Sequence, residues 1–114
     1  MECIFCKIVQ GEIPATILYE NDKVLAFKDV NPEAPNHLLV IPKKHIRSMV
    51  DATEEDINDI FPEIFRIIQR LAVDLQMDGE GYRIVNNCGK KGGQTVDHLH
   101  FHLMGGRQML WPPG

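Results

Sequence analysis

Three histidines recur at every second position near the end of the chain, at His98, His100 and His102. The residues between them are large and apolar. Successive side chains of a β-strand point to opposite faces, so this spacing places the three imidazoles on one face and the apolar groups on the other. Imidazole binds metals, phosphates and protons near neutral pH. We therefore predict that residues 98–104 form a strand with one chemically active face.

A glycine-rich segment, residues 86–95, leads into these histidines. Gly92 and Gly93 permit positive φ angles and leave the backbone N–H groups open to a ligand. Consecutive inward-facing N–H groups form an anion-binding concavity, and Gln94 and Thr95 add side-chain donors. A lone Gly-Gly pair is more typical of a turn. Next to a row of imidazoles, it predicts half of a phosphate site.

Cys3 and Cys6 have the spacing that lets two thiolates hold one tetrahedral metal ion. Zinc needs two further ligands, and His45 and His98 are available. A third cysteine, Cys88, is distant in the sequence, and an odd number of cysteines argues against a disulfide framework. The pair alone is also compatible with metal-free thiols. Redox chemistry is disfavoured, because no thioredoxin-like βαβ pattern surrounds the pair.

Composition and charge restrict the class of protein. With 114 residues, 44% of them hydrophobic and 25% charged, the chain suits one globular domain over residues 1–114. The formal net charge of −4 argues against a sequence-independent nucleic-acid partner. No apolar run approaches the about 20 residues of a membrane span, and no signal-peptide pattern is present. We expect no membrane partner and a cytoplasmic location.

Hydrophobic periodicity predicts the elements that position these residues. A short helix over residues 5–10 is expected to end at Gly11, and strands are expected over 16–19, 23–29, 37–42 and 82–87. One long helix is expected over 53–77, because Thr53 and Asp56 have capping-box spacing and apolar residues then recur every three or four positions. The mixture predicts an α+β fold.

The run from His98 to Met104 matches the alternating signature of the histidine-triad (HIT) nucleotide hydrolases. The resemblance extends over nearly the whole chain, through residues 3–8, 12–14, 26–29, 37–46 and 92–95. The C-terminal ten residues, 105–114, are similar to those of the Hint branch. The resemblance implies a HIT-like fold, with an antiparallel five-stranded sheet, one long helix and one short helix. It further implies that the sheet continues across a homodimer.

The resemblance also implies ligands and the residues that hold them. Zinc, in a structural role, is implied at Cys3, Cys6, His45 and His98. The nucleotide-binding residues implied are Asp29, Asn87, Gly93, Phe5, Ile8, Ile13, Phe27, Val30 and Trp111. Among these, the Asp29 carboxylate accepts hydrogen bonds from a ribose, and Trp111 reaches toward the partner's active site. Taken without the resemblance, Asp29 is better interpreted as a turn cap and the apolar residues as ordinary core.

His100 is the predicted nucleophile, because it is the middle histidine of the face. Its attack on an α-phosphate forms a covalent nucleotidyl-imidazole, which water then hydrolyses. The attacking nitrogen must be unprotonated, so the other ring N–H needs an acceptor such as the His98 carbonyl. His102 is expected to bind a non-bridging phosphate oxygen, and His37 to orient or protonate. The remaining predicted catalytic residues, which hold the phosphate and leaving group, are Gln94 and Thr95.

The Hint resemblance favours phosphoramidates of AMP or GMP as substrates, with no cofactor required for catalysis. One alternative is a dinucleoside polyphosphate hydrolase, which Gly105-Gly106-Arg107 after the triad disfavours. A second alternative is a nucleotide- or zinc-binding interaction module with weak activity. One departure from the resemblance is Asp97, because relatives usually carry an aromatic or aliphatic residue there.

Overall fold

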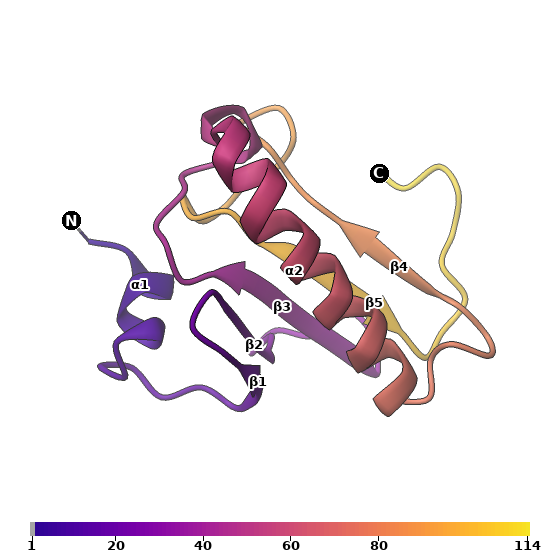
Figure 1. The fold of residues 1–114 in the computed structure, drawn as a ribbon. Helices are drawn as coiled ribbons and strands as arrows, with labels where there is room; N and C mark the ends of the chain where they lie inside the picture. The colour runs from indigo at the N-terminus through magenta and orange to yellow at the C-terminus, as the bar shows by residue number, and fades with distance from the viewer. Residues whose placement is uncertain (1) are drawn as a thin grey trace.

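The structure, a computed structural model, describes residues 2–114 of the chain. Its elements follow in the order α1 (Ile4–Val9), β1 (Ile17–Glu20), β2 (Val24–Lys28), β3 (Asn36–Pro42), the 3-10 helix η1 (Met49–Asp51), α2 (Glu54–Asp74), β4 (Tyr82–Val85) and β5 (Phe101–Gly105). The strands form one antiparallel sheet in the order β1-β2-β3-β5-β4 (Figure 1). The predicted α+β fold, with a five-stranded antiparallel sheet and one long and one short α-helix, is confirmed.

The long helix α2 begins with the predicted capping box. The Asp56 N–H donates to the Thr53 hydroxyl at 3.1 Å, and the Thr53 N–H donates to the Asp56 carboxylate at 3.0 Å. Two donors at the helix start are thereby satisfied. Lys44 pairs with Asp56 at 2.7 Å, and this contact, followed by the Thr53 hydrogen bonds, lowers the pKa of the Asp56 carboxyl. The side chains that α2 buries are Asp56, Ile60, Phe61, Ile64, Ile67, Ile68, Leu71 and Ala72.

The two faces of the sheet carry different helices. α2 crosses one face (Figure 1), where it packs on apolar residues of four strands and of the segment before β5. On the opposite face, α1 places Phe5 and Ile8 against apolar side chains of β2 and β3. The Phe5 ring lies 5.2 Å from the His100 ring, in an edge-to-face arrangement. The imidazoles therefore lie on the α1 face, at the border of this second cluster.

Strand β5 begins three residues later than the predicted strand 98–104, so His102 lies in it and His98 and His100 precede it. Regular pairing with β3 begins only at Phe101. Before it, the Leu99 N–H donates to the Ile46 carbonyl at 2.6 Å, and the His98 carbonyl accepts from the His100 ring. These contacts take the place of strand pairing where the chain bends to bring His98 toward α1. The alternation nevertheless holds, because the three apolar residues between and after the histidines enter the α2 core.

One region of the surface keeps large apolar side chains exposed. Ile57 and Phe65 of α2 are 44% and 45% exposed, and Tyr82 and Ile84 of β4 are 38% and 41% exposed. β4 lies at the edge of the sheet, so one side of its backbone is open, and the C-terminal segment extends on this side of the molecule (Figure 1). Within residues 2–114, none of the helices has the length and apolar character that crossing a bilayer requires.

Candidate active site and metal centre

The backbone fixes the ring of His100 in one tautomer. The side chain is buried, and its Nδ1 lies 2.7 Å from the carbonyl oxygen of His98. Because a carbonyl only accepts, Nδ1 carries the proton and Nε2 keeps a free lone pair. The predicted contact with the His98 carbonyl is thus present. The Asn86 side-chain amide donates to the His100 carbonyl at 3.0 Å and holds the backbone of the nucleophile candidate in place.

His37 and His102 form a hydrogen-bonded pair beside His100. The Glu33 N–H donates to His37 Nδ1 at 3.0 Å, so neutral His37 carries its proton on Nε2. That nitrogen lies 2.9 Å from His102 Nδ1 and donates to it, which leaves the proton of neutral His102 on Nε2. The rings of His100 and His102 are 5.1 Å apart. One ring therefore offers a lone pair and its neighbour offers an N–H donor.

The local environment keeps His102 uncharged at neutral pH. Burial lowers the pKa of His102 to about 4, and repulsion from the neighbouring His100 and His37 rings in their protonated forms adds to this effect, against a small opposing effect of Asp29. Asp29 Oδ2 lies 3.4 Å from His37 Nε2. Asp29, His37 and His102 are close enough to share a cation. However, the His37–His102 hydrogen bond already uses the two facing nitrogens, so direct pairing accounts for this cluster.

A cavity of about 590 Å³ opens beside these histidines. Its volume lies within the range of sites for small organic ligands. Its wall contains most of the predicted substrate-site residues, namely Phe5, Ile8, Ile13, Phe27, Asp29, Val30, His37, Thr95, His100 and His102. The Phe5 and Phe27 rings meet edge to face, with centroids 5.5 Å apart. Val30 is 86% exposed, which places it at the rim.

Asp29 caps a turn at this cavity. Its Oδ1 accepts from the Asn31 N–H at 2.8 Å, and its own N–H donates to the His37 carbonyl at 3.0 Å. The turn-capping interpretation of the sequence is therefore confirmed. The turn also holds the carboxylate at the cavity wall, with Oδ2 toward His37. Its contact with a ribose stays a prediction.

Side chains of the glycine-rich loop are used to shape the loop itself. Gln94 Oε1 accepts from the Gly89 N–H at 2.8 Å, and Gln94 Nε2 donates to the Arg47 carbonyl at 2.8 Å. Asn87 donates to the Gly92 carbonyl at 2.7 Å. A side chain at Gly92 would collide with the backbone of residue 88, so this close turn requires glycine. The direct contacts of Gln94 and Asn87 with a nucleotide stay predictions.

The loop does not present the expected row of free amides. Gly93 adopts a φ of +80°, and its N–H donates to the Lys90 carbonyl at 3.1 Å. The Gln94 N–H donates to the Gly89 carbonyl at 3.1 Å. Two amides of the predicted concavity are thus already paired. Four predicted nucleotide-site residues do not line the 590 Å³ cavity: Asn87, Gly93, Gln94 and Trp111, which is 83% exposed. Of the two side-chain donors predicted in the loop, Gln94 and Thr95, only Thr95 lies on the cavity wall.

The second group of histidines meets the two N-terminal cysteines. Cys3 Sγ lies 3.3 Å from His98 Nδ1, Cys6 Sγ lies 3.3 Å from His45 Nδ1, and the two Nδ1 atoms are 3.2 Å apart. In a tetrahedral zinc site, with Zn–S near 2.3 Å and Zn–N near 2.0 Å, these separations are about 3.6 and about 3.3 Å. The four side chains therefore fit a Cys₂His₂ zinc ion, the ligand set that the resemblance implies.

The ring of His98 is oriented for a cation. Its Nε2 donates to the Pro42 carbonyl at 2.8 Å, so the Nδ1 lone pair is directed at the cluster. Burial lowers the pKa of His98 and thereby favours the neutral, metal-binding form. Burial, together with the neighbouring Cys3, raises the pKa of the Cys6 thiol to about 11. A bound cation is what would hold this thiol as a thiolate at neutral pH.

Comparisons with known proteins agree with the fold. The sequence model of the HIT domain family matches residues 10–109 of this chain. The chain belongs to the HIT family. An uncharacterized HIT-like protein of Synechococcus elongatus is 49% identical over 113 residues, which cover 99% of this chain and 97% of that protein. A 14 kDa zinc-binding protein of Zea mays is 46% identical over 113 residues, covering 97% and 87% of the two chains.

A solved HIT family structure superposes closely on this one. The crystal structure of a HIT family hydrolase from Legionella pneumophila has a TM-score of 0.96 at 50% identity. The match covers 99% of this chain and all of that chain. At this identity and coverage, the hydrolase-like HIT fold extends over essentially the full length of the described residues.

Sequence reasoning missed the backbone groups that fix the rings. The Pro42 carbonyl and the Glu33 N–H set the tautomers of His98 and His37. Every residue has a carbonyl and nearly every residue has an N–H, so no residue type signals these contacts. The Asn86 side chain is different, because an asparagine before a glycine-rich loop is a recognisable candidate for a backbone contact.

Proposed function

We propose that this HIT family protein hydrolyses purine nucleoside phosphoramidates by cleaving the P–N bond that joins AMP or GMP to an amine. One observation carries this proposal. The tautomer of neutral His100 leaves a lone pair on Nε2, beside the N–H donor His102, on the wall of a largely apolar cavity. A nucleophile and an electrostatic stabiliser are thus adjacent, which is the arrangement that covalent transfer at phosphorus requires.

The first step is a displacement at the α-phosphorus. His100 Nε2 forms a bond to phosphorus as the P–N bond breaks, and the departing amine takes up a proton from solvent. The Nδ1–H remains bonded to the His98 carbonyl, which stabilises the positive charge that develops on the ring. His102 donates its Nε2–H to a non-bridging oxygen, where negative charge grows in the transition state.

The second step returns the enzyme to its starting state. Water attacks phosphorus, the P–Nε2 bond breaks, and the nucleoside monophosphate leaves. The proton that water loses balances the one taken up by the amine. His37 does not transfer a proton in this scheme. It fixes the orientation and tautomer of His102 through the 2.9 Å hydrogen bond.

The remaining cavity residues suit a nucleoside. Phe5 and Phe27 supply aromatic surface for a purine, with aliphatic support from Ile8 and Ile13. The Asp29 carboxylate offers acceptors for ribose hydroxyls. The Thr95 hydroxyl is available to the phosphate or the leaving group.

Zinc and a second copy of the chain complete the proposal. When bound at Cys3, Cys6, His45 and His98, zinc supplies structural cross-linking between α1, the segment after β3 and the start of the triad. The exposed apolar side chains of α2 and β4 support a symmetric homodimer, because surplus apolar surface is typical of an interface. In such a dimer, Trp111 is proposed to lie near the partner's cavity.

The experiment that tests this function follows adenosine 5′-phosphoramidate carrying a fluorescent amine. We expect turnover by the native protein and its loss in both His100→Ala and His100→Gly. Acid quenching of the native reaction should trap a protein species heavier by one nucleotidyl group, located on His100. No turnover by metal-replete protein would contradict the proposal. Hydrolysis of dinucleoside polyphosphates instead would indicate the alternative hydrolase, and failure of both would indicate a binding module.

A further inference from the structure

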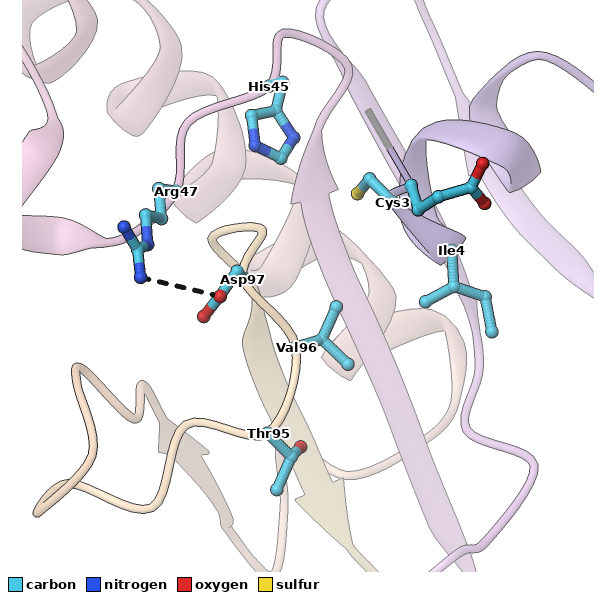
Figure 2. A pocket seen from close by; sticks show the side chains of 8 residues that line it. Cys3, Ile4, His45, Arg47, Thr95, Val96 and Asp97 are labelled. Atoms are coloured by element: carbon cyan, nitrogen blue, oxygen red, sulfur yellow. Dashed lines mark ion pairs between the residues drawn. The ribbon is translucent and has the colours of Figure 1, made fainter.

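A second cavity, of about 540 Å³, opens directly on the candidate metal centre. Two of the four metal-ligand candidates, Cys3 and His45, form part of its wall (Figure 2). The wall also carries the charged side chains of Glu2, Arg47 and Asp97. Neither the sequence pattern nor the proposed hydrolysis uses these three charges.

The cavity faces one part of the metal centre that solvent can reach, at His45, whereas the partly exposed Cys6 lies off its wall. His98 is completely buried and Cys3 is only 6% exposed, so a metal ion needs a path through the surrounding protein. His45 is partly exposed, and in Figure 2 it and Cys3 stand at the same side of the cavity. An ion in the cavity would thus meet one thiol and one imidazole first.

The charges of the cavity have opposite effects on a divalent cation. Arg47 and Asp97 form an ion pair at 3.6 Å, and both side chains are 69% exposed (Figure 2). The Asp97 carboxylate attracts a cation, whereas the Arg47 guanidinium repels it and neutralises Asp97. The Gln94 amide donates to the Arg47 carbonyl, which anchors the Arg47 backbone to the glycine-rich loop. The Arg47 end of the pair is therefore held at the cavity through its backbone.

We propose that this cavity is the route by which the metal ion enters and leaves the centre, with Asp97 accelerating its capture and Arg47 slowing it. The inference rests on the proposed zinc centre. The two cavities share wall residues, including Thr95 and Val96, but Arg47 and Asp97 belong only to this one. Arg47 and Asp97 would thus act on the metal ion and not on the nucleotide.

The test measures how fast cobalt(II) enters metal-free protein in a stopped-flow instrument. Cobalt bound to thiolate gives a charge-transfer absorption, so the readout does not depend on catalysis. At low ionic strength we expect capture to slow about threefold in Asp97→Asn and to accelerate about threefold in Arg47→Gln, as one unit charge near a divalent ion's path would cause. Both differences should disappear at high salt, while the final absorption stays that of the native protein.

Matched controls come from ion pairs elsewhere on the surface. Asp59→Asn and Arg66→Gln change the net charge equally, but these residues pair with Lys23 and Glu63, away from the cavity wall. We expect both controls to load at the native rate. If Asp97→Asn and Arg47→Gln also load at that rate with a normal final spectrum, the route is wrong and the metal centre stands. If native protein gives no thiolate–cobalt absorption, the metal centre and the route both fail.

Discussion

The two histidine groups of this protein suit ligands of opposite charge, although they are built from the same residue type and share one segment of chain. His98 donates its Nε2–H to the Pro42 carbonyl and turns a lone pair toward two cysteines. His102 accepts at Nδ1 from His37 and turns an N–H toward the substrate cavity. The first arrangement suits a cation and the second a phosphate.

The difference lies in the partner of each ring. A ring nitrogen that faces a carbonyl oxygen must carry the proton, because a carbonyl only accepts. A ring nitrogen that faces an N–H, whether of the backbone or of another imidazole, must offer its lone pair. His100 shows the first effect, because the His98 carbonyl places the proton on Nδ1 and leaves the lone pair on Nε2. The comparison teaches that histidine chemistry in this fold is set by backbone groups rather than by the histidines alone.

The largest effect is expected when one histidine is removed from each group. His100→Ala should lower kcat/KM for an adenosine phosphoramidate about ten-thousandfold and leave the cobalt absorption intact, because the nucleophile takes no part in metal binding. His98→Ala should do the reverse. It loses a metal ligand but keeps the carbonyl that fixes His100. Equal loss of turnover in a folded His98→Ala protein would show that the groups are not separable.

The next effect concerns the stability that the metal contributes. The double variant Cys3→Ser/Cys6→Ser should lose about 3 kcal/mol of unfolding free energy in zinc-containing buffer, because a metal bound only by the folded state stabilises it. Turnover per folded molecule should fall less than tenfold. Urea denaturation measures the first quantity, with chelator-treated native protein as the matched control. A turnover loss as large as that of His100→Ala would contradict a structural role.

A smaller effect tests the relay through His37. His37→Leu removes the donor to His102 Nδ1, and we expect kcat to fall about a hundredfold as His102 loses its preferred tautomer. His37→Gln keeps an N–H donor and should retain most of the rate. Nitrogen NMR of the imidazole reports the His102 tautomer directly. Identical rates for the two variants, with an unchanged tautomer, would argue against the relay.

The smallest effect is a pH dependence of stability. The pKa of His102 is about 4 in the folded protein, against an ordinary value of 6.5. Between pH 6.5 and 4 the unfolded chain binds a proton there that the folded chain does not, so stability is full above 6.5 and falls as the pH is lowered. We expect a loss of about 1–2 kcal/mol over this range in metal-free protein. The comparison is with His102→Gln, which should show a flatter profile.

The sequence predicts the fold well where local signals decide it. Thr53 and Asp56 place the start of α2, because a capping box needs only four consecutive residues. The predicted start of β5 was wrong by three residues, because a hydrogen bond between Leu99 and Ile46, which are distant in the sequence, replaces strand pairing. A period of two in the sequence shows which side of the sheet a residue faces, but not whether its backbone is paired.

In the candidate site, too, local signals could be predicted and contacts between distant segments could not. The four metal-ligand candidates could be proposed from residue types and spacing, whereas the apolar cavity residues were predicted only through the resemblance to the HIT family. The glycine-rich loop could not, because Gln94 satisfies groups on Gly89 and Arg47, and two loop amides pair within the turn. Arg47 and Asp97 are separated by fifty positions in the chain, so only the fold shows that they form a pair.

His98 offers a ring nitrogen to the metal centre and a carbonyl oxygen to the nucleophile. A single residue therefore takes part in both candidate sites. If occupancy of the metal centre changes the affinity for nucleotide by some factor, occupancy by nucleotide must change the affinity for metal by the same factor. A titration of cobalt in the presence and absence of AMP thus measures, from the metal side, how strongly the metal centre influences nucleotide binding.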